Sequence, residues 1–177
     1  MRLTCLRRPL HDPEYEAIIA DLLNHDFVRM MRDFVQHGDT CTLEHCVNVS
    51  YLCYRFGKRH GMDAVSLARA GLLHDLYLYD WHDVIPEEID KRGKHAFYHP
   101  KVALGNALQI TTLNKKERDI IIRHMWPVTP VLPKYKESWV IIWMDKYCAF
   151  MEFFIEKRIA SRKKLLKVVT KLRNILR

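Results

Sequence analysis

Apolar residues recur every three or four positions along most of this 177-residue chain. Val49, Leu52 and Phe56 are one example, and such spacing predicts helices that each bury one face. We expect helices over 13–24, 26–36, 42–60, 63–75, 100–110, 114–126, a stretch around Asp145 and 156–177, with a loop and one short helix over 79–94. No Asn-Gly or Asp-Gly hairpin turn occurs, and polar–apolar alternation is weak. The sequence therefore predicts an all-α, single-domain helical bundle.

Short polar residues mark where these helices are expected to begin. Thr42, Asp63 and Asn114 each precede a stretch with helical spacing, as N-cap residues do. Pro100 is expected at the first position of its helix, where the N–H that proline lacks has no helical partner. His99 would then lie just before the helix and face outward from a loop.

Six imidazole and carboxylate side chains lie on these helices or at their starts. They are His45, His74, Asp75, His99, His124 and Asp145. Helical spacing places all but His99 on faces that are expected to be buried, and Asp145 has Ile141 and Cys148 as neighbours on its own face. Burying a carboxylate without a partner is costly, and a metal ion compensates imidazole and carboxylate together. A single buried histidine is usually hydrogen-bonded in a core, but six such residues favour a metal site.

The order of these residues resembles a known family. The resemblance rests on the segments LEHCVNVSYLCYRFGKRHG, ARAGLLHDLYLYDWHD, YHPKVALGNAL, IIRHMWP and WMDKYCAF, from about Leu43 to about Phe150. Together they resemble the HD-domain metal-dependent phosphohydrolases, and the two additional histidines resemble the subset with a two-metal site. The resemblance implies the helical, phosphodiesterase-like fold of that family.

The resemblance also implies a ligand set for one or two divalent transition metals. The first metal would take His45, His74, Asp75 and Asp145, and the second would take His99 and His124, with Asp75 bridging as the central catalytic residue. Nitrogen and oxygen ligands without thiolate suit Fe, Mn, Ni, Zn or Co, and affinity alone does not choose among them.

The implied activity is hydrolysis of a small phosphate ester, such as a nucleotide, by a metal-activated water. Some two-metal members carry a lysine shortly after His-Asp, but here Asp75 is followed by Leu76, Tyr77, Leu78, Tyr79 and Asp80. That missing lysine leaves open an alternative, a sensor or binding module that holds a phosphorylated ligand without turnover. The Gly-Tyr-Pro element of the cyclic-di-GMP-cleaving branch and the Glu-Asp pair of the guanosine tetraphosphate hydrolases are also missing, which argues against those substrates.

A phosphate group still needs cations to bind it. The candidates are Lys101, Arg123, Lys134 and Lys146, and the alternative for each is a solvated surface charge. Lys101 would lie in the first turn of its helix, where free backbone N–H groups also favour an anion. The segment 126–135 contains three prolines and is expected to be a stiff loop that either lines the pocket or simply connects two helices.

The charge of the chain is concentrated at its C-terminal end. Residues 156–177 contain nine Lys or Arg and one acid, whereas residues 1–155 contain twenty of each sign. We therefore divide the chain into N-terminal helices (1–40), a metal-binding core (41–152) and a basic amphipathic helix (153–177). Such a helix could bind nucleic acid or an anionic surface. We favour packing of its apolar side on this domain or on the partner in a homodimer.

Composition limits the cellular setting. No apolar run approaches the roughly 18 residues of a membrane span, and the basic N-terminus has no apolar signal segment. Five cysteines without a Cys-x-x-Cys pair are expected to be reduced, mostly in the core. We therefore expect a cytoplasmic protein whose partner is a small phosphorylated substrate.

Overall fold

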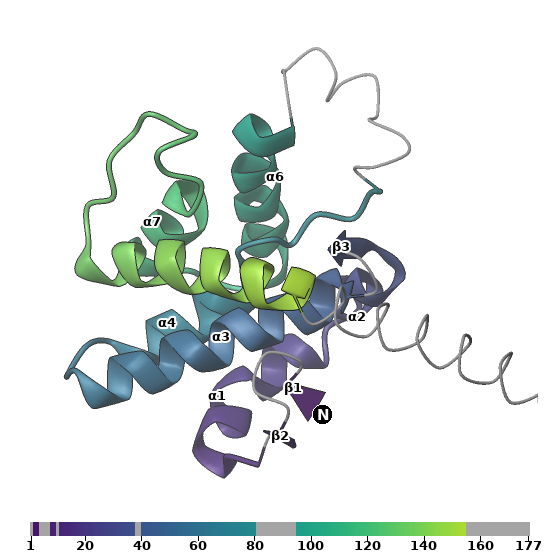
Figure 1. Cartoon of the computed structure of the whole chain (residues 1–177), viewed down its shortest axis with the longest axis vertical. Coiled ribbons are helices and arrows are strands. Elements are labelled where there is room, and N and C mark those ends of the chain that lie inside the picture. Colours follow the sequence, from purple (N-terminus) through teal and green to yellow (C-terminus); the bar gives the residue numbers. More distant parts are fainter. Residues whose placement is uncertain (1, 4–7, 10, 38–39, 81–94, 155–177) are drawn as a thin grey trace, which may run out of the picture.

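The computed structural model describes residues 2–3, 8–9, 11–37, 40–80 and 95–154, and it confirms the all-α class (Figure 1). The helices are α1 (Pro13–Leu23), α2 (Asp26–Met30), the 3-10 helix η1 (Met31–Asp33), α3 (Thr42–Arg59), α4 (Ala64–Leu73), α6 (His95–Ile110), α7 (Lys115–Arg123) and a helix over 136–154. Two short antiparallel strand pairs accompany them, β1 (Arg2–Leu3) with β2 (Arg8–Pro9) and β3 (Val35–His37) with β4 (Thr40–Cys41). Among the described residues, no helix is both long and apolar enough to cross a bilayer.

Helices α3 and α4 form the centre of the bundle and pack against each other over most of their length (Figure 1). A Cβ atom added to Gly71 of α4 would lie 2.8 Å from Cα of Ser50 on α3, so only glycine permits this approach. Ser50 Oγ donates to the carbonyl of Ala68 at 2.6 Å and accepts from the Tyr15 hydroxyl of α1 at 2.8 Å. The small residues before His74 therefore bring that histidine close to α3.

Two of the expected helix caps are confirmed. Asp63 accepts from the N–H of Ser66 at 3.0 Å, and Asn114 forms a reciprocal capping box with Glu117. At the start of α3 the expectation was wrong by one residue, because Cys41 is the N-cap and Thr42 is the first helical residue.

The expected helix over 26–36 is wrong in its second half. The α-helix ends at Met30. The chain then forms η1 and continues into β3, a strand that helical spacing did not predict. Pairing of β3 with β4 ends the helix early, and both the N–H and the Oγ1 of Thr42 donate to the carbonyl of Phe34, at 2.9 and 3.2 Å. This extended segment carries Gln36 into the protein interior.

The start of α6 also differs from the expectation. Pro100 lies inside the helix, not at its first position, and the described helix begins at His95. Proline there forgoes one helical hydrogen bond. In compensation, the helical turn before Pro100 buries the side chains of Tyr98 and His99. Most of the expected 79–94 loop, and the C-terminal helix beyond residue 154, lie outside the described residues.

The helix over 136–154 is fixed at its start by buried carboxylates. Ser138 Oγ donates to Asp119 of α7 at 2.7 Å, and the backbone N–H of Lys134 donates to the same carboxylate oxygen at 2.9 Å. The buried Glu137 accepts from the N–H of Asp63 and from the Lys116 ammonium, both at 3.2 Å. These contacts set the position of the helix against α4 and α7, and with it the position of Asp145.

Candidate metal centre

All six sequence-predicted ligand residues come together, although they come from five separate elements. His45 lies in the first turn of α3, His74 and Asp75 at the end of α4, His99 in α6, His124 at the end of α7, and Asp145 on the helix over 136–154. Five of them are buried and Asp145 is partly buried. The expectation that His99 faces outward from a loop was wrong, because His99 lies inside α6 and is only 4% exposed.

The six side chains form two groups of potential metal ligands. In the first group, Asp145 Oδ1 lies 3.2 Å from His45 Nε2 and 3.8 Å from His74 Nε2. In the second group, the Nε2 atoms of His99 and His124 are 2.8 Å apart, and Asp75 Oδ1 lies 3.2 and 3.3 Å from them.

Asp75 lies between the two groups and presents one carboxylate oxygen to each. Its Oδ1 faces His99 and His124, whereas its Oδ2 lies 3.5 Å from His74 Nε2. The side-chain amide of Gln36 donates to Oδ2 at 2.7 Å and so fixes the carboxylate. This is the arrangement expected of a ligand that bridges two ions.

Each of the four histidines has its Nδ1 atom held by an acceptor. The acceptors are Glu152 Oε2 for His45 at 2.9 Å, Gly71 O for His74 at 2.8 Å, His95 O for His99 at 2.9 Å and Ile121 O for His124 at 2.8 Å. An acceptor at Nδ1 assigns the proton of a neutral imidazole to that nitrogen. The Nε2 lone pairs are therefore free for a metal, and all four point into the centre.

These lone pairs require a cation. With the proton on Nδ1, the Nε2 atoms of His99 and His124 face each other at 2.8 Å as two acceptors, next to the acceptor Asp75 Oδ1. The buried His74 Nε2 and Asp75 Oδ1 make no hydrogen bond with any described residue. Two ligand atoms at right angles, each about 2.1 Å from one ion, lie about 3.0 Å apart. The separations in the second group match that value, so the residues present fit a divalent metal.

The electrostatics of the centre also favour bound positive charge. Burial opposes ionisation of Asp75, but His74, His124 and His99 together outweigh it and hold the pKa of Asp75 well below its usual range. Burial likewise opposes protonation of His45, but hydrogen bonds that it donates to Asp145 and Glu152 raise the pKa of His45 well above its usual value. In both cases burial disfavours charge and a partner of opposite sign reverses the effect.

Two supporting residues were not anticipated from the sequence. Glu152 is buried, holds His45 and accepts from the Asn48 amide at 3.1 Å. It lies seven residues after Asp145 on the same helical face, so the spacing that identified Asp145 could have identified it too. Gln36 gave no such signal, because its place on β3 depends on strand pairing that the sequence does not reveal.

A cavity of about 450 Å³ opens onto the second group. It is lined by Gln36, Asp75, His95, Ala96, His99, His124, Met125, Val128, Asp145, Lys146 and Ala149. Of the four candidate cations, Lys146 alone is among these lining residues. Arg123 Nε lies 3.6 Å from Asp119 Oδ1. Lys101 and Lys134 are exposed and do not line the cavity. The proline-rich loop contributes Val128 to the wall.

The tyrosines that follow Asp75 support the site by packing. Tyr77 is buried, and its hydroxyl donates to Gln36 Oε1, so it orders the amide that holds Asp75. Tyr79 pairs its hydroxyl with His95 Nδ1 at 3.1 Å, and the rings of His95 and His99 stack with centroids 4.5 Å apart. Trp81, the third aromatic residue of this sequence stretch, lies outside the described residues.

Comparison with protein families agrees with this geometry. The family model described as HD domain matches residues 42–149, well over half of the chain and a range that includes all six candidate ligands. The chain therefore belongs to the HD-domain family, an all-α family in which histidine and aspartate pairs hold divalent metals. Comparisons with curated proteins and with solved structures gave no match.

Proposed function

We propose that this protein is a metal-dependent phosphohydrolase that cleaves a small phosphate ester. This proposal rests on the two ligand groups with Asp75 between them, because each group offers imidazole and carboxylate to one ion. His45, His74, Asp75 and Asp145 would hold the first metal, and Asp75, His99 and His124 the second. When bound, such a metal pair lowers the pKa of a water molecule and stabilises charge on phosphoryl oxygens.

The protein's own part is to position these groups. The acceptors at each Nδ1 fix the ring orientations, and Gln36 fixes the bridging carboxylate. Lys146 is the cation along the described cavity wall that could bind a phosphoryl oxygen. Lys146 lies on the helix over 136–154, whereas the lysine of some two-metal members lies shortly after their His-Asp pair. The missing lysine of the sequence motif therefore does not leave the cavity without a cation.

The cavity supports a small substrate with an apolar part. Its volume of about 450 Å³ falls within the range of about 300–1,000 Å³ that is usual for small-molecule sites. Met125, Val128 and Ala149 provide apolar wall beside the polar centre. A phosphomonoester or phosphodiester of nucleotide size fits these properties.

Metal analysis combined with a substrate panel tests the proposal. We expect the purified protein, reconstituted with Mn or Fe, to hold metal and to release phosphate or alcohol from at least one phosphate ester. Asp75→Ala should lose both metal and turnover, because it removes the shared ligand. His60→Ala, which alters an exposed histidine on the far end of α3, is the matched control and should change neither. Metal binding without turnover of any ester would favour the sensor alternative instead.

A further inference from the structure

The helix over 136–154 carries an exposed aromatic stripe on its outer side. The stripe consists of Trp143, Tyr147, Phe150 and Phe154, which are 66%, 45%, 59% and 51% exposed. Their steps of four, three and four residues place them on one helical face. Asp145 and Glu152 point to the opposite side, into the metal centre. The outer face of a helix on a water-exposed surface normally carries charge, so four large aromatic residues there indicate a contact surface.

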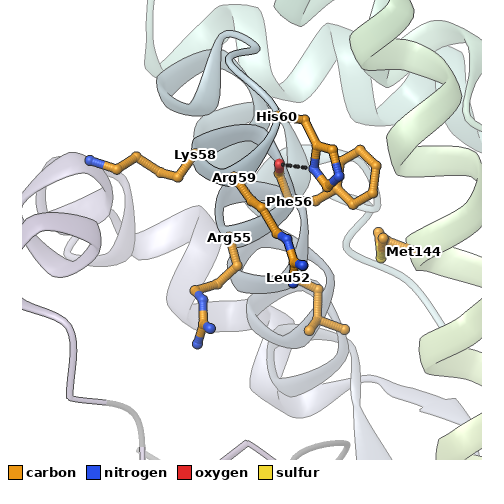
Figure 2. A pocket seen from close by; sticks show the side chains of 7 residues that line it. All are labelled: Leu52, Arg55, Phe56, Lys58, Arg59, His60 and Met144. Carbon is orange, nitrogen blue, oxygen red and sulfur yellow. Dashed lines mark hydrogen bonds between the residues drawn. The ribbon is translucent and has the colours of Figure 1, made fainter.

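A basic groove borders this stripe. It has a volume of about 790 Å³ and lies between α3 and the helix over 136–154 (Figure 2). It is lined by the apolar Leu52, Phe56 and Met144 and by the polar Arg55, Lys58, Arg59 and His60. Met144 lies one helical turn before Tyr147, so the groove meets the stripe at this residue.

Two positive charges of the groove are available to a ligand. Lys58 is paired with Glu14 at 2.7 Å, but Arg55 and Arg59 are exposed and form no ion pair with a carboxylate of the described chain. The Arg55 guanidinium lies over the Tyr51 ring, 5.8 Å from its centroid, which directs it along the surface. Residues 155–177, which directly follow Phe154, have a net charge of +8.

We propose that the aromatic stripe and the basic groove are a docking face for an anionic lipid bilayer. Tryptophan, tyrosine and phenylalanine insert at the boundary between headgroups and acyl chains, while arginine and lysine attract anionic headgroups. The surface combines both requirements over adjoining parts of two helices. The protein would bind peripherally, with the metal centre on the side of the helix away from the lipid.

Charge and composition favour lipid over the other possible occupants. A second copy packed on the same face would bring Arg55 and Arg59 of two chains near each other, which like-charge repulsion disfavours. Single-stranded nucleic acid would need aromatic rings free to stack, but Phe150 and Phe154 pack on each other with centroids 4.4 Å apart. The basic segment 155–177 is rich in Ile, Leu and Val and contains no aromatic residue, which suits acyl chains better than bases.

Vesicle sedimentation with the full-length protein tests this proposal. We expect binding to phosphatidylcholine vesicles that contain phosphatidylserine, little binding to vesicles of phosphatidylcholine alone, and weaker binding as salt is raised. Y147Q/F150Q should weaken binding about tenfold by removing apolar contacts. R55Q/R59Q should weaken it about fivefold for each charge removed. F97Q is the matched control, because Phe97 is 46% exposed on α6 and lies in neither surface.

Three results would overturn the proposal. The first is equal binding to neutral and anionic vesicles, or no binding to either. The second is a dimer in analytical ultracentrifugation that Y147Q/F150Q dissociates while vesicle binding stays unchanged, which would assign the stripe to self-association. The third is loss of vesicle binding in competition with a single-stranded oligonucleotide that itself requires Tyr147 and Phe150. Metal content and phosphatase activity should be unchanged in these variants, so this test is independent of the proposed hydrolase activity.

Discussion

The side-chain amide of Gln36 holds Oδ2 of Asp75 at 2.7 Å, and the Tyr77 hydroxyl in turn holds the carbonyl oxygen of that amide. Asp75 lies between the two ligand groups, so a residue on β3 fixes the carboxylate that faces both of them. Replacing a residue that orients a metal ligand typically lowers metal affinity about 10–100-fold.

Replacing Gln36 should therefore weaken metal binding without removing a ligand. We expect Gln36→Ala to lower metal affinity about 10–100-fold, because Asp75 loses the donor that fixes it. Calorimetric titration of the metal-free protein measures this directly. Gln109→Ala, on the exposed side of α6, is the control and should bind metal as the wild type does. Unchanged affinity in Gln36→Ala would show that the turn after α4 holds Asp75 in place without Gln36.

Glu152 offers a test of how His45 is held. Its Oε2 accepts from His45 Nδ1 at 2.9 Å, and both side chains are buried. Glu152→Gln keeps the size of the side chain but removes its negative charge, so His45 becomes a weaker ligand. We expect the first metal to bind about tenfold more weakly while the second site is little changed. Equal loss at both sites, measured by titration with elemental analysis, would mean that Glu152 supports the fold of the whole centre.

The sequence predicted the residues of the centre better than it predicted their surroundings. Helical spacing identified Asp145 as a buried carboxylate, and the same spacing would have found Glu152. His99 was placed wrongly because Pro100 was taken as a helix start, a local preference that packing overrides. Gln36 could not be found at all, because nothing in its local pattern predicts β3, and its partner Asp75 lies 39 residues away in the sequence. Family resemblance, not spacing, joined the six residues into one site.

Metal removal should lower the stability of the protein. The ligand groups carry buried carboxylate oxygens and imidazole lone pairs that a metal would compensate, so a metal bound there would stabilise the folded chain over the unfolded one. Saturation at about 100 times Kd would add about 2.7 kcal/mol to the free energy of unfolding. We expect chelation with EDTA to lower the melting temperature, and readdition of metal to restore it. Asp75→Ala should melt at the same temperature with and without EDTA.

Gly71 should not tolerate a side chain. A Cβ atom there would lie 2.8 Å from backbone Cα of Ser50, and neither helix can shift without moving His74. We expect Gly71→Ala to lower the free energy of unfolding by about 1–3 kcal/mol and to weaken metal binding. Gly105→Ala on α6 is the matched control, because the new methyl group would have no described atom within 4 Å apart from the backbone of its own helix and its chain neighbours. That variant should be stabilised by about 0.5–1 kcal/mol, as expected for glycine in a helix. Denaturant unfolding of both variants gives the comparison.

Asp63 should make the stability of the bundle sensitive to acid. Burial acts to raise its pKa, but hydrogen bonds from Ser66 and the Lys116 ammonium outweigh it and hold the pKa of Asp63 below its usual value. A carboxyl whose pKa is lower in the folded state adds stability above its unfolded pKa and loses it as the pH falls through the folded pKa.

Asp63→Asn isolates this contribution, because asparagine can still cap α4 but carries no charge. At neutral pH the wild type should be the more stable protein, since Asp63 also pairs with Lys116 at 3.2 Å. As the pH falls below about 4, the usual pKa of aspartate, the difference between the two proteins should shrink toward zero. Urea unfolding across this range measures the difference. A gap that persists in acid would mean that the carboxylate acts through shape and hydrogen bonding and not through its charge.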